Sequence, residues 1–226
     1  MKAIVLFVAI IIIASCTKKS GSAIKVVKDM VNNQKVEFQY DSVKKVKQGY
    51  YKFFYENGTV AIEKNYLNDT LEGSQKEYHP SGKISGEFNL KKGKFEGNFK
   101  YFHENGKLHQ EGTYVNNLIE GELKLYYNNG SLKEVVSMVN SEEKGPFTEY
   151  HENGKIKSKG EYLKGPNSEI CILEKYNVDG KIESKMLCDG KAGCCTVWSA
   201  EKGDIRQNNP KSQKIIEEMK DKCPAK

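Results

Sequence analysis

Arginine is almost absent from this chain: Arg206 is the only arginine among 36 basic residues, and the others are lysines. Proteins that read nucleic acids use arginine for bidentate contacts to bases and phosphates. The lysines here are interspersed with glutamates, which is the pattern of a solvated surface. Despite a net charge of +6, the sequence therefore predicts no nucleic-acid partner.

Catalytic motifs are missing as well. No Ser-His-Asp arrangement, phosphate-binding loop, paired-histidine metal motif or CxxC redox motif stands out. Glu72, Glu96 and Glu120 could suggest acid-base chemistry, but they recur at equal spacing, each directly before a glycine. Equal repetition favours a charged rim or loop position over a paired catalytic site. We predict a protein that is not an enzyme and that binds no cofactor.

Glycine, in contrast, recurs with a fixed period. One series is spaced by 24 residues and ends with a step of 26: Gly58, Gly82, Gly106, Gly130, Gly154 and Gly180. A second series keeps the period of 24: Gly49, Gly73, Gly97, Gly121 and Gly145. Regular spacing of this kind marks a repeat array. Arrays present extended surfaces, so the pattern favours binding over catalysis.

Each repeat unit has the pattern of a β-hairpin. An aromatic residue, followed directly by Tyr or His, comes before the turn in every unit. The turn is Asn-Gly in four units and Ser81-Gly82 in the remaining one, and an apolar β-former follows it. Asn-Gly predicts a type I′ turn, and the second glycine series predicts a looser loop. Two strands add roughly 10 Å of ribbon. We predict an all-β, elongated antiparallel ribbon of roughly 12 strands, with equivalent aromatics stacked between units.

The unit Tyr/Phe-x-x-Asn-Gly-Lys with its following glycine resembles the MORN repeat variant of bacterial proteins, over residues 36–182 and best over residues 49–162. Classical MORN units have a shorter period and contain a tryptophan, and these repeats contain no tryptophan. Some bacterial relatives carry an antitoxin label, a role that does not fit an exported chain. The resemblance implies a MORN-like β-repeat array, which we assign to residues 36–190.

The amino terminus predicts export. The apolar run over residues 3–14 would span roughly 18 Å as a helix, short of the roughly 30 Å of a bilayer core. We therefore assign residues 1–15 to a signal peptide. The sequence IASC, which ends at Cys16, resembles the bacterial lipobox, in which the cysteine is lipidated. We expect an anchor at Cys16, in the outer membrane, and a tether over residues 16–35 with a short helix at Ile24 to Val31.

The remaining cysteines lie in the last quarter of the chain. They are candidate disulfide residues, because export permits disulfides: Cys171, Cys188, Cys194, Cys195 and Cys223. Five is an odd number, so at least one has no partner within this set. Cys171 and Cys188 flank one turn and could staple it, and one of the adjacent pair could reach Cys223. We predict a Cys-rich cap over residues 191–226, with a short helix after Asn209-Pro210; a redox or metal site is the alternative.

A strip of rings is the candidate binding site. His79, His103 and His151 occupy equivalent positions, which lie roughly 10 Å or more apart and cannot share one zinc ion. Tyrosine fills the same position in two other units, so the position requires a flat amphipathic ring, and we predict no metal site. The predicted strip consists of Tyr55, His79, Tyr101, His103, Tyr127 and His151.

The strip predicts a non-catalytic binding or scaffold protein, whose partner is an envelope protein or a surface ligand. Peripheral lipid contact is the alternative, because classical MORN proteins are often linked to membranes. An envelope enzyme with a pocket near the cap is the least favoured hypothesis.

Overall fold

The computed structural model describes residues 23–31, 34–163, 170–189 and 193–204, together with Gln213 and Glu217. Its strands form one sheet. Their bounds are β1 Ile24–Val31, β2 Gln34–Asp41, β3 Val46–Phe54, β4 Val60–Leu67, β5 Thr70–Tyr78, β6 Ile84–Lys91, β7 Lys94–Phe95, β8 Gly97–Phe102, β9 Leu108–Val115, β10 Leu118–Tyr126, β11 Leu132–Val139, β12 Glu142–Tyr150, β13 Ile156–Tyr162, β14 Ile170–Tyr176, β15 Ile182–Asp189, β16 Gly193–Ser199 and β17 Gly203–Asp204.

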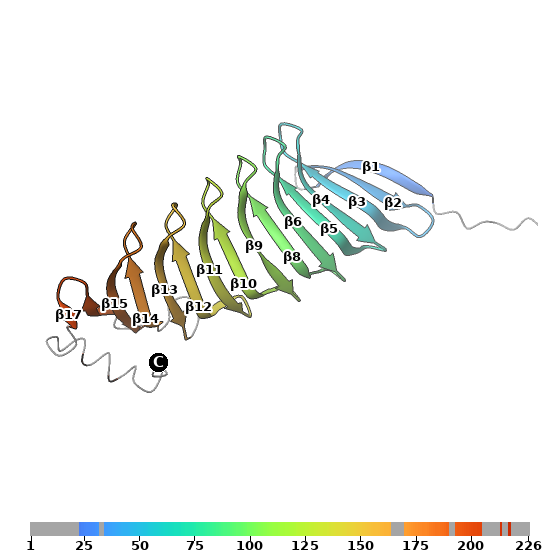
Figure 1. Ribbon diagram of the computed structural model, residues 1–226. Helices are drawn as coiled ribbons and strands as arrows, with labels where there is room; N and C mark the ends of the chain where they lie inside the picture. Colours follow the sequence, from blue (N-terminus) through green and yellow to red (C-terminus); the bar gives the residue numbers. More distant parts are fainter. Residues whose placement is uncertain are drawn as a thin grey trace, which may run out of the picture.

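Each strand pairs antiparallel with the next along the chain, so the hairpins lie side by side in sequence order. β7 and β8 are two parts of one strand, interrupted at Glu96, and both pair with β6. The result is a long ribbon with its first strand at one end and its last at the other (Figure 1). The predicted all-β repeat ribbon is confirmed, and it contains more strands than predicted.

The predicted turn types are wrong. Gly58 has φ 85°, whereas Asn57 is not among the residues with positive φ, so Asn57-Gly58 is not a type I′ turn. Tyr55 N–H donates to the Thr59 carbonyl and Gly58 N–H to the Tyr55 carbonyl, at 2.8 and 2.9 Å. This is a three-residue loop, a type I turn followed by a left-handed glycine. Asn57 Oδ1 accepts a hydrogen bond from Thr59 N–H, which supports the wider loop.

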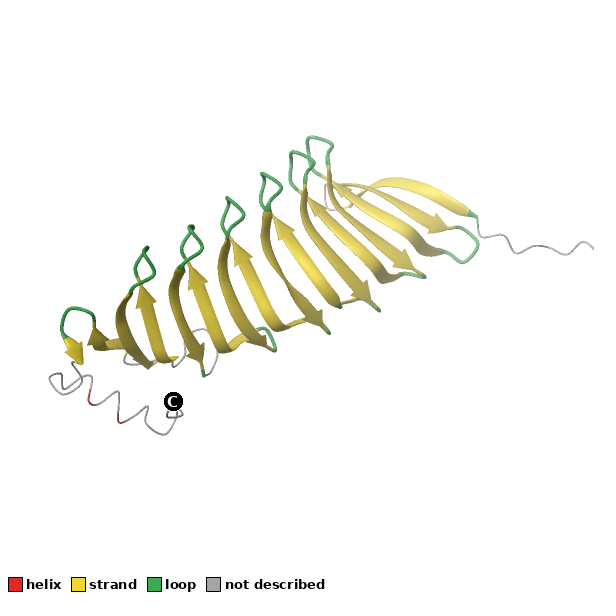
Figure 2. Ribbon diagram, in the orientation of Figure 1, coloured by secondary structure: helices red, strands yellow, loops and turns green. Residues whose placement is uncertain are grey.

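The type I′ turns lie at the opposite ends of the strands, where a looser loop was predicted. Both central residues have positive φ in Asn68-Asp69, Lys92-Gly93, Asn116-Asn117 and Asn140-Ser141. Each pair connects two strands directly, as a two-residue hairpin turn does. The wide loops therefore line one edge of the ribbon and the tight turns line the other (Figure 2).

The second glycine series marks a bulge in each repeat. In β10, residues 121–123 lie opposite the single residue Gly112 of β9, and Gly121 has φ 79°. Gly73 and Gly145 have φ 86° and 95°, beside equivalent register shifts. A bulge with a left-handed glycine bends its strand and increases the local twist. Repetition of this bend once per hairpin lets the side chains of one face cover one another.

The core lies on one face of the sheet, and rings from neighbouring repeats build it. Its buried residues are Phe88, Phe99, Leu123, Val136, Met138 and Phe147. Phe99 is 1% exposed, and its ring centroid lies 4.6 Å from that of Tyr114. Phe95 joins Phe88 to Tyr114, with ring centroids 5.4 and 5.2 Å apart. Aromatic contacts thus continue from one repeat into the next, but they join rings at different positions of the repeat, whereas the sequence predicts stacking of equivalent ones.

Two glycines without positive φ make room for these rings. A Cβ atom at Gly86 would lie 2.7 Å from Phe88 Cε2, and one at Gly112 would lie 2.9 Å from Phe99 Cε1. Both distances are shorter than real Cβ contacts allow. Glycine is therefore required at these positions by the buried phenylalanines rather than by a turn.

Two predictions at the ends of the array need correction or lie outside the described residues. The sheet begins within the segment predicted as a tether: Ile24–Val31 is strand β1 rather than a helix. It pairs over its whole length with β2, which supplies the backbone partners that a helix would otherwise provide. The predicted carboxyl-terminal helix falls almost wholly outside the described residues, as do Cys16 and Cys223.

We expect Gly112→Ala to lower the free energy of unfolding by about 1–3 kcal/mol, because the added methyl group overpacks the Phe99 ring. Urea unfolding followed by circular dichroism measures the change. Lys91→Ala, at an exposed position of the tight-turn edge, is the matched control and should leave the midpoint nearly unchanged. Equal midpoints for the two variants would show that the glycine does not serve the core.

Candidate binding face

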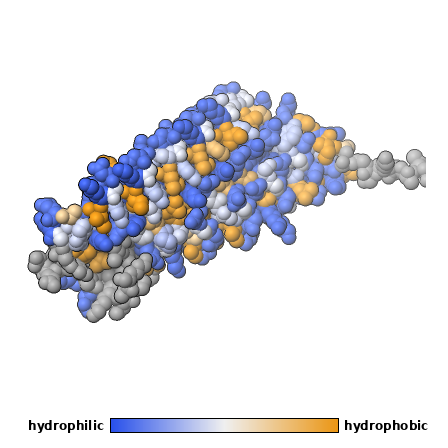
Figure 3. Space-filling view, in the orientation of Figure 1, coloured by the Kyte–Doolittle hydropathy of each residue, from blue (hydrophilic) through white to orange (hydrophobic). Residues whose placement is uncertain are grey.

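Alternation along each strand gives the ribbon two different faces. One carries the core described above, and we call it the core face. The other carries most of the lysines and glutamates of the strands, and we call it the charged face. Apolar and hydrophilic side chains form alternating bands on the visible side of the molecule (Figure 3). Because many rings of the core face are packed against one another, the charged face is the candidate binding surface.

A single row of alternating lysines and glutamates crosses the charged face, with directly opposed residues on successive strands. The row consists of Lys28, Glu37, Lys52, Glu63, Lys76, Glu87, Lys100, Glu111 and Lys124. Lys52 Nζ lies 3.7 Å from Glu63 Oε1, and Lys76 Nζ lies 3.7 Å from Glu87 Oε1. Opposite charges directly across strands contribute roughly 0.2–1 kcal/mol each. The signs alternate along the row, so the row contains no block of one sign.

The charge row is interrupted once. Beyond Lys124 the next two positions are Val135 and Thr148, which are opposite each other on β11 and β12. The row then resumes with Lys159, Glu174 and Lys185. We call Val135 and Thr148 the neutral window.

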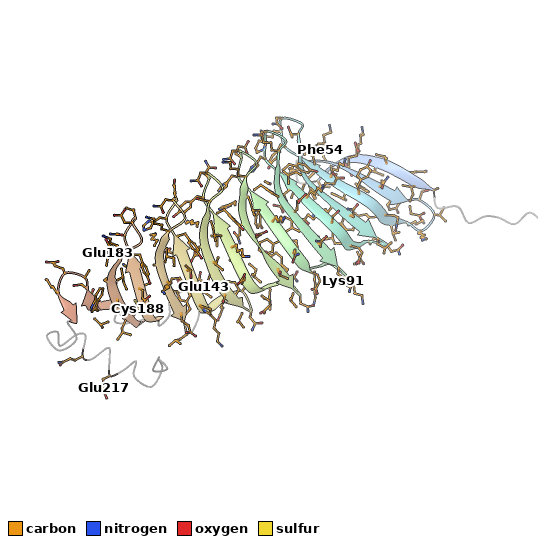
Figure 4. The ribbon with its side chains drawn as sticks, viewed as in Figure 1. Phe54, Lys91, Glu143, Glu183, Cys188 and Glu217 are labelled. Carbon is orange, nitrogen blue, oxygen red and sulfur yellow. The ribbon has the colours of Figure 1, made fainter. Side chains whose placement is uncertain are left out.

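One aromatic ring at an equivalent position of each repeat lies beside the charge row, and the first repeat adds Tyr50, whose Oη donates to Glu37 Oε1 at 2.9 Å. We call the equivalent rings the ring row; all its members are half-buried, and they are Phe54, Tyr78, Phe102, Tyr126, Tyr150 and Tyr176. Lys35 Nζ is 5.1 Å from the Phe54 ring centroid. Tyr126 Oη donates to Glu111 Oε1 at 2.7 Å, which places its ring on the charged face. In Figure 4, Phe54 lies at the wide-loop edge of the ribbon and Lys91 lies at the opposite edge.

Five of the six residues in the predicted strip lie in the wide loops, and each makes a hydrogen bond to the next hairpin. Tyr55 Oη donates to the Tyr78 carbonyl and Tyr127 Oη donates to the Tyr150 carbonyl, at 2.6 and 2.7 Å. The Nε2 atoms of the three histidines make the same contact, at 3.0–3.2 Å: His79 to Phe102, His103 to Tyr126 and His151 to Tyr176. We call these five residues the loop ladder. One polar atom of each ring is therefore already committed to holding the repeats together.

The sixth residue of the predicted strip lies elsewhere. Tyr101 is on the core face, where its ring meets Phe88 and Phe99 at centroid distances of 5.1 and 5.9 Å. Burial raises its pKa. The ring row, in contrast, was not identified from the sequence as a surface. Its signal was present as the aromatic residue that follows each glycine of the second series by five positions.

The repeated glutamates have a structural role at the other edge. Glu72 Oε2 accepts a hydrogen bond from Lys92 N–H, and Glu96 Oε2 accepts one from Asn116 N–H, at 2.8 and 2.9 Å. Glu120 Oε1 accepts the equivalent bond from Asn140 N–H at 2.8 Å. Each carboxylate thus satisfies the first amide of the next type I′ turn. The predicted rim or loop position is confirmed, with a defined partner.

A polar hollow of about 440 Å³ lies where the fifth repeat meets the sixth hairpin. Glu149, His151, Ser158, Lys175 and Tyr162 are among its lining residues. Ser158 Oγ donates to Glu149, whereas His151 contacts a backbone carbonyl, so the two do not form a nucleophile–base pair. Burial, together with nearby glutamates, raises the pKa of Tyr162 to about 12. These partners make the hollow part of the packing between repeats.

Four of the six cysteines lie among the described residues, in β14, β15 and β16. Among the described residues, no group of three or more His, Cys, Asp or Glu could hold a metal ion. Cys188 of β15 is 3% exposed, and its backbone lies opposite Cys194 of β16. Cys195 lies opposite Leu187, and Cys171 lies in β14, next to the residue opposite Cys188. The described residues also contain no helix with the length and apolarity needed to cross a membrane.

Stacked hairpins, spacing glycines and side-chain contacts at both edges define an open β-repeat protein. Five matches to the MORN repeat variant family cover residues 47–68, 71–92, 95–116, 119–140 and 143–164, one hairpin each. These repeats belong to the MORN repeat variant family. Membership supports a binding or scaffold module, in agreement with the surface described above.

The other comparisons add little. The comparison with curated proteins gave no match. Among solved structures, the chain is similar to a crystal structure of an S. aureus TarM mutant in complex with Fondaparinux, alpha-GlcNAc-glycerol and UDP, with 12% identity and a TM-score of 0.31. The similarity covers 53% of this chain and 21% of that chain. A TM-score this low carries no argument about fold or function.

The charge row makes one pH-dependent prediction. Burial alone would raise the pKa of Glu174, but hydrogen bonds from Tyr176, Lys185 and Lys159 outweigh it and lower the pKa to about 2. A carboxylate whose pKa is lower in the folded state stabilises the fold above its ordinary pKa of 4.5, and this stabilisation is lost as the pH falls toward 2. Glu174→Gln should therefore be less stable at pH 7 by roughly 1–3 kcal/mol.

Urea unfolding at pH 7, 4.5 and 2.5 measures this effect. The loss of stability between pH 4.5 and 2.5 should be smaller for Glu174→Gln than for the wild type. Glu183→Gln, at an exposed position of the same hairpin, serves as the control and should follow the wild type. Parallel curves for all three proteins would contradict the assignment.

Proposed function

We propose that this protein is an exported, lipid-anchored and non-catalytic scaffold of the bacterial cell envelope, and that it binds its partner across the charged face. The observation that carries the proposal is the ring row, which presents one half-buried aromatic side chain per repeat beside a row of alternating charges. Amphipathic rings combined with polar neighbours are the groups that dominate protein binding surfaces.

The spacing of the rings indicates the shape of the partner. Successive rings are two strands apart, roughly 10 Å. A small ligand would contact one ring, whereas an extended envelope protein or surface polymer would contact several. Binding across several repeats adds weak contacts along one rigid surface. We therefore expect an elongated partner.

The neutral window favours the middle of the row as the strongest contact. Val135 and Thr148 replace a charged pair between two members of the ring row, Tyr126 and Tyr150. Removing water from this stretch costs less than desolvating a lysine and a glutamate. A partner that buries the window would leave the charged pairs on either side at its rim.

The test is photo-crosslinking in the native envelope with three versions of the chain. With the double variant Phe102→Ala/Tyr150→Ala, the amount of crosslinked partner recovered should fall about tenfold, because two contact rings are removed. Val43→Ala removes an exposed apolar side chain in the turn after β2 and should recover the partner as the wild type does. Circular dichroism verifies that each variant is folded. Equal recovery with all three versions would contradict the proposed face.

The amino-terminal sequence supports the anchoring part of the proposal. The apolar run and the IASC sequence that ends at Cys16 have the order of a lipoprotein signal. Wild-type protein from cells grown with labelled palmitate should carry the label and enter the detergent phase on phase separation. Cys16→Ser should do neither. Label on the Cys16→Ser variant would contradict lipidation at this residue.

The cysteines support a stabilised carboxyl-terminal end of the array. Cys188 is buried and disulfide-bonded, in the hairpin that follows the last matched repeat. An exported location is compatible with such a bond. A disulfide at this point would stabilise the described end of the sheet, where β17 consists of two residues.

Peripheral lipid contact is the less favoured function. Binding to anionic membranes requires clustered positive charge, and the lysines of the charged face alternate with glutamates. Salt-sensitive binding of the unlipidated chain to anionic vesicles would support the lipid function at the expense of the protein or polymer partner.

A further inference from the structure

Within the described residues, the first strand of the ribbon is an open edge. Among the described strands, β1 pairs only with β2, and seven of its eight residues are exposed. Its exposed apolar side chains include Val26 at 53% and Met30 at 60%. A long edge strand with exposed apolar side chains is a template for pairing with another strand.

The backbone geometry shows which residues face the open side. The Ala23 carbonyl accepts a hydrogen bond from Ser42 N–H, so the odd-numbered residues direct their backbone groups toward β2. Met30 N–H instead donates to the adjacent Asp29 carboxylate at 2.7 Å. The even-numbered residues of β1 therefore direct their N–H and C=O groups away from the sheet. Asp29 satisfies the Met30 amide in the single chain, and pairing with another strand would replace this hydrogen bond.

We propose that β1 pairs antiparallel with β1 of a second copy, about a two-fold axis at Val27, so that two ribbons join into one continuous sheet. This register matches hydrogen-bonding residues with each other: Ile24 faces Met30 of the other copy, and Val26 faces Lys28. Lys25 and Asp29 then face each other twice across the axis, as oppositely charged neighbours on one face.

Neighbouring registers lack this complementarity. Antiparallel pairing requires even-numbered residues to face even-numbered ones, so the axis can move only by whole residues. An axis at Lys28 would place two lysines directly opposite each other, which is unfavourable. An axis at Val26 would place Lys25 opposite Val27 and leave Asp29 without a lysine. Charge therefore selects Val27.

The other end of the ribbon argues for a second copy in this head-to-head arrangement. The last described strand, β17, consists of Gly203–Asp204 only. It covers only two residues of the seven-residue β16, so the described edge at this end is divided between two short strands and does not match the eight residues of β1. Two β1 strands have the same length by symmetry, and an isologous contact closes after two copies.

Cysteine crosslinking in the full-length chain tests the axis. Val27→Cys places two thiols on the two-fold axis, within reach of one another, and should give a disulfide-linked homodimer in the native envelope. Val43→Cys, 61% exposed in the turn after β2, is the matched control and should give no more homodimer than the wild type. Equal yields for the two variants, or a crosslink from Val27→Cys to a different protein, would overturn the proposal.

Charge reversal tests the register without a core substitution. Lys25→Glu or Asp29→Lys alone should weaken the dimer severalfold in sedimentation experiments on the detergent-solubilised full chain. The double variant Lys25→Glu/Asp29→Lys should restore it, because the pair is kept with its signs exchanged. A wild type that is monomeric at all concentrations, or a double variant that is no better than the single ones, would overturn the proposal.

Discussion

The hydrogen bonds that join each hairpin to the next are the interaction on which this ribbon depends. At the wide-loop edge, the loop ladder connects a tyrosine or histidine ring to a backbone carbonyl of the following hairpin. At the tight-turn edge, Glu72, Glu96 and Glu120 accept hydrogen bonds from backbone amides of the next turn. A single hairpin is at best marginally stable in water, so these contacts and the shared core make the array one body.

Because the same contacts join every hairpin to the next, the candidate binding surface is regular. Rings on the core face and in the loops are used within the protein, whereas the ring row remains at the surface beside the alternating charges. Because the bulge recurs in every repeat, the charged face keeps the same orientation from hairpin to hairpin. Departures from the pattern, such as Val135 and Thr148, then distinguish one part of the surface from another.

The sequence predicts the period, the strands and the open ribbon, because turn residues and alternation are local signals. It does not predict which end of each hairpin has the tight turn. The Asn57 side chain accepts a hydrogen bond from Thr59 N–H and so supports a wider loop, whereas glutamates of the neighbouring repeat bind the amides of the type I′ turns. The candidate strip was assigned from ring type alone. Its polar atoms proved to be bonded within the protein, and Tyr101 proved to face the core. Such assignments require knowledge of the bulges, which shift the register within most of the strand pairs.

Tyr127→Phe tests most directly whether the loop ladder joins the repeats, since it keeps the ring and removes only the hydroxyl that donates to the Tyr150 carbonyl. Hydrogen exchange and urea unfolding should show faster exchange in the loops around residues 127 and 150, and a loss of about 1 kcal/mol of stability. Recovery of the crosslinked partner should be unchanged. Unaltered exchange with a loss of partner recovery would contradict the account, and would mean that the ladder serves binding instead.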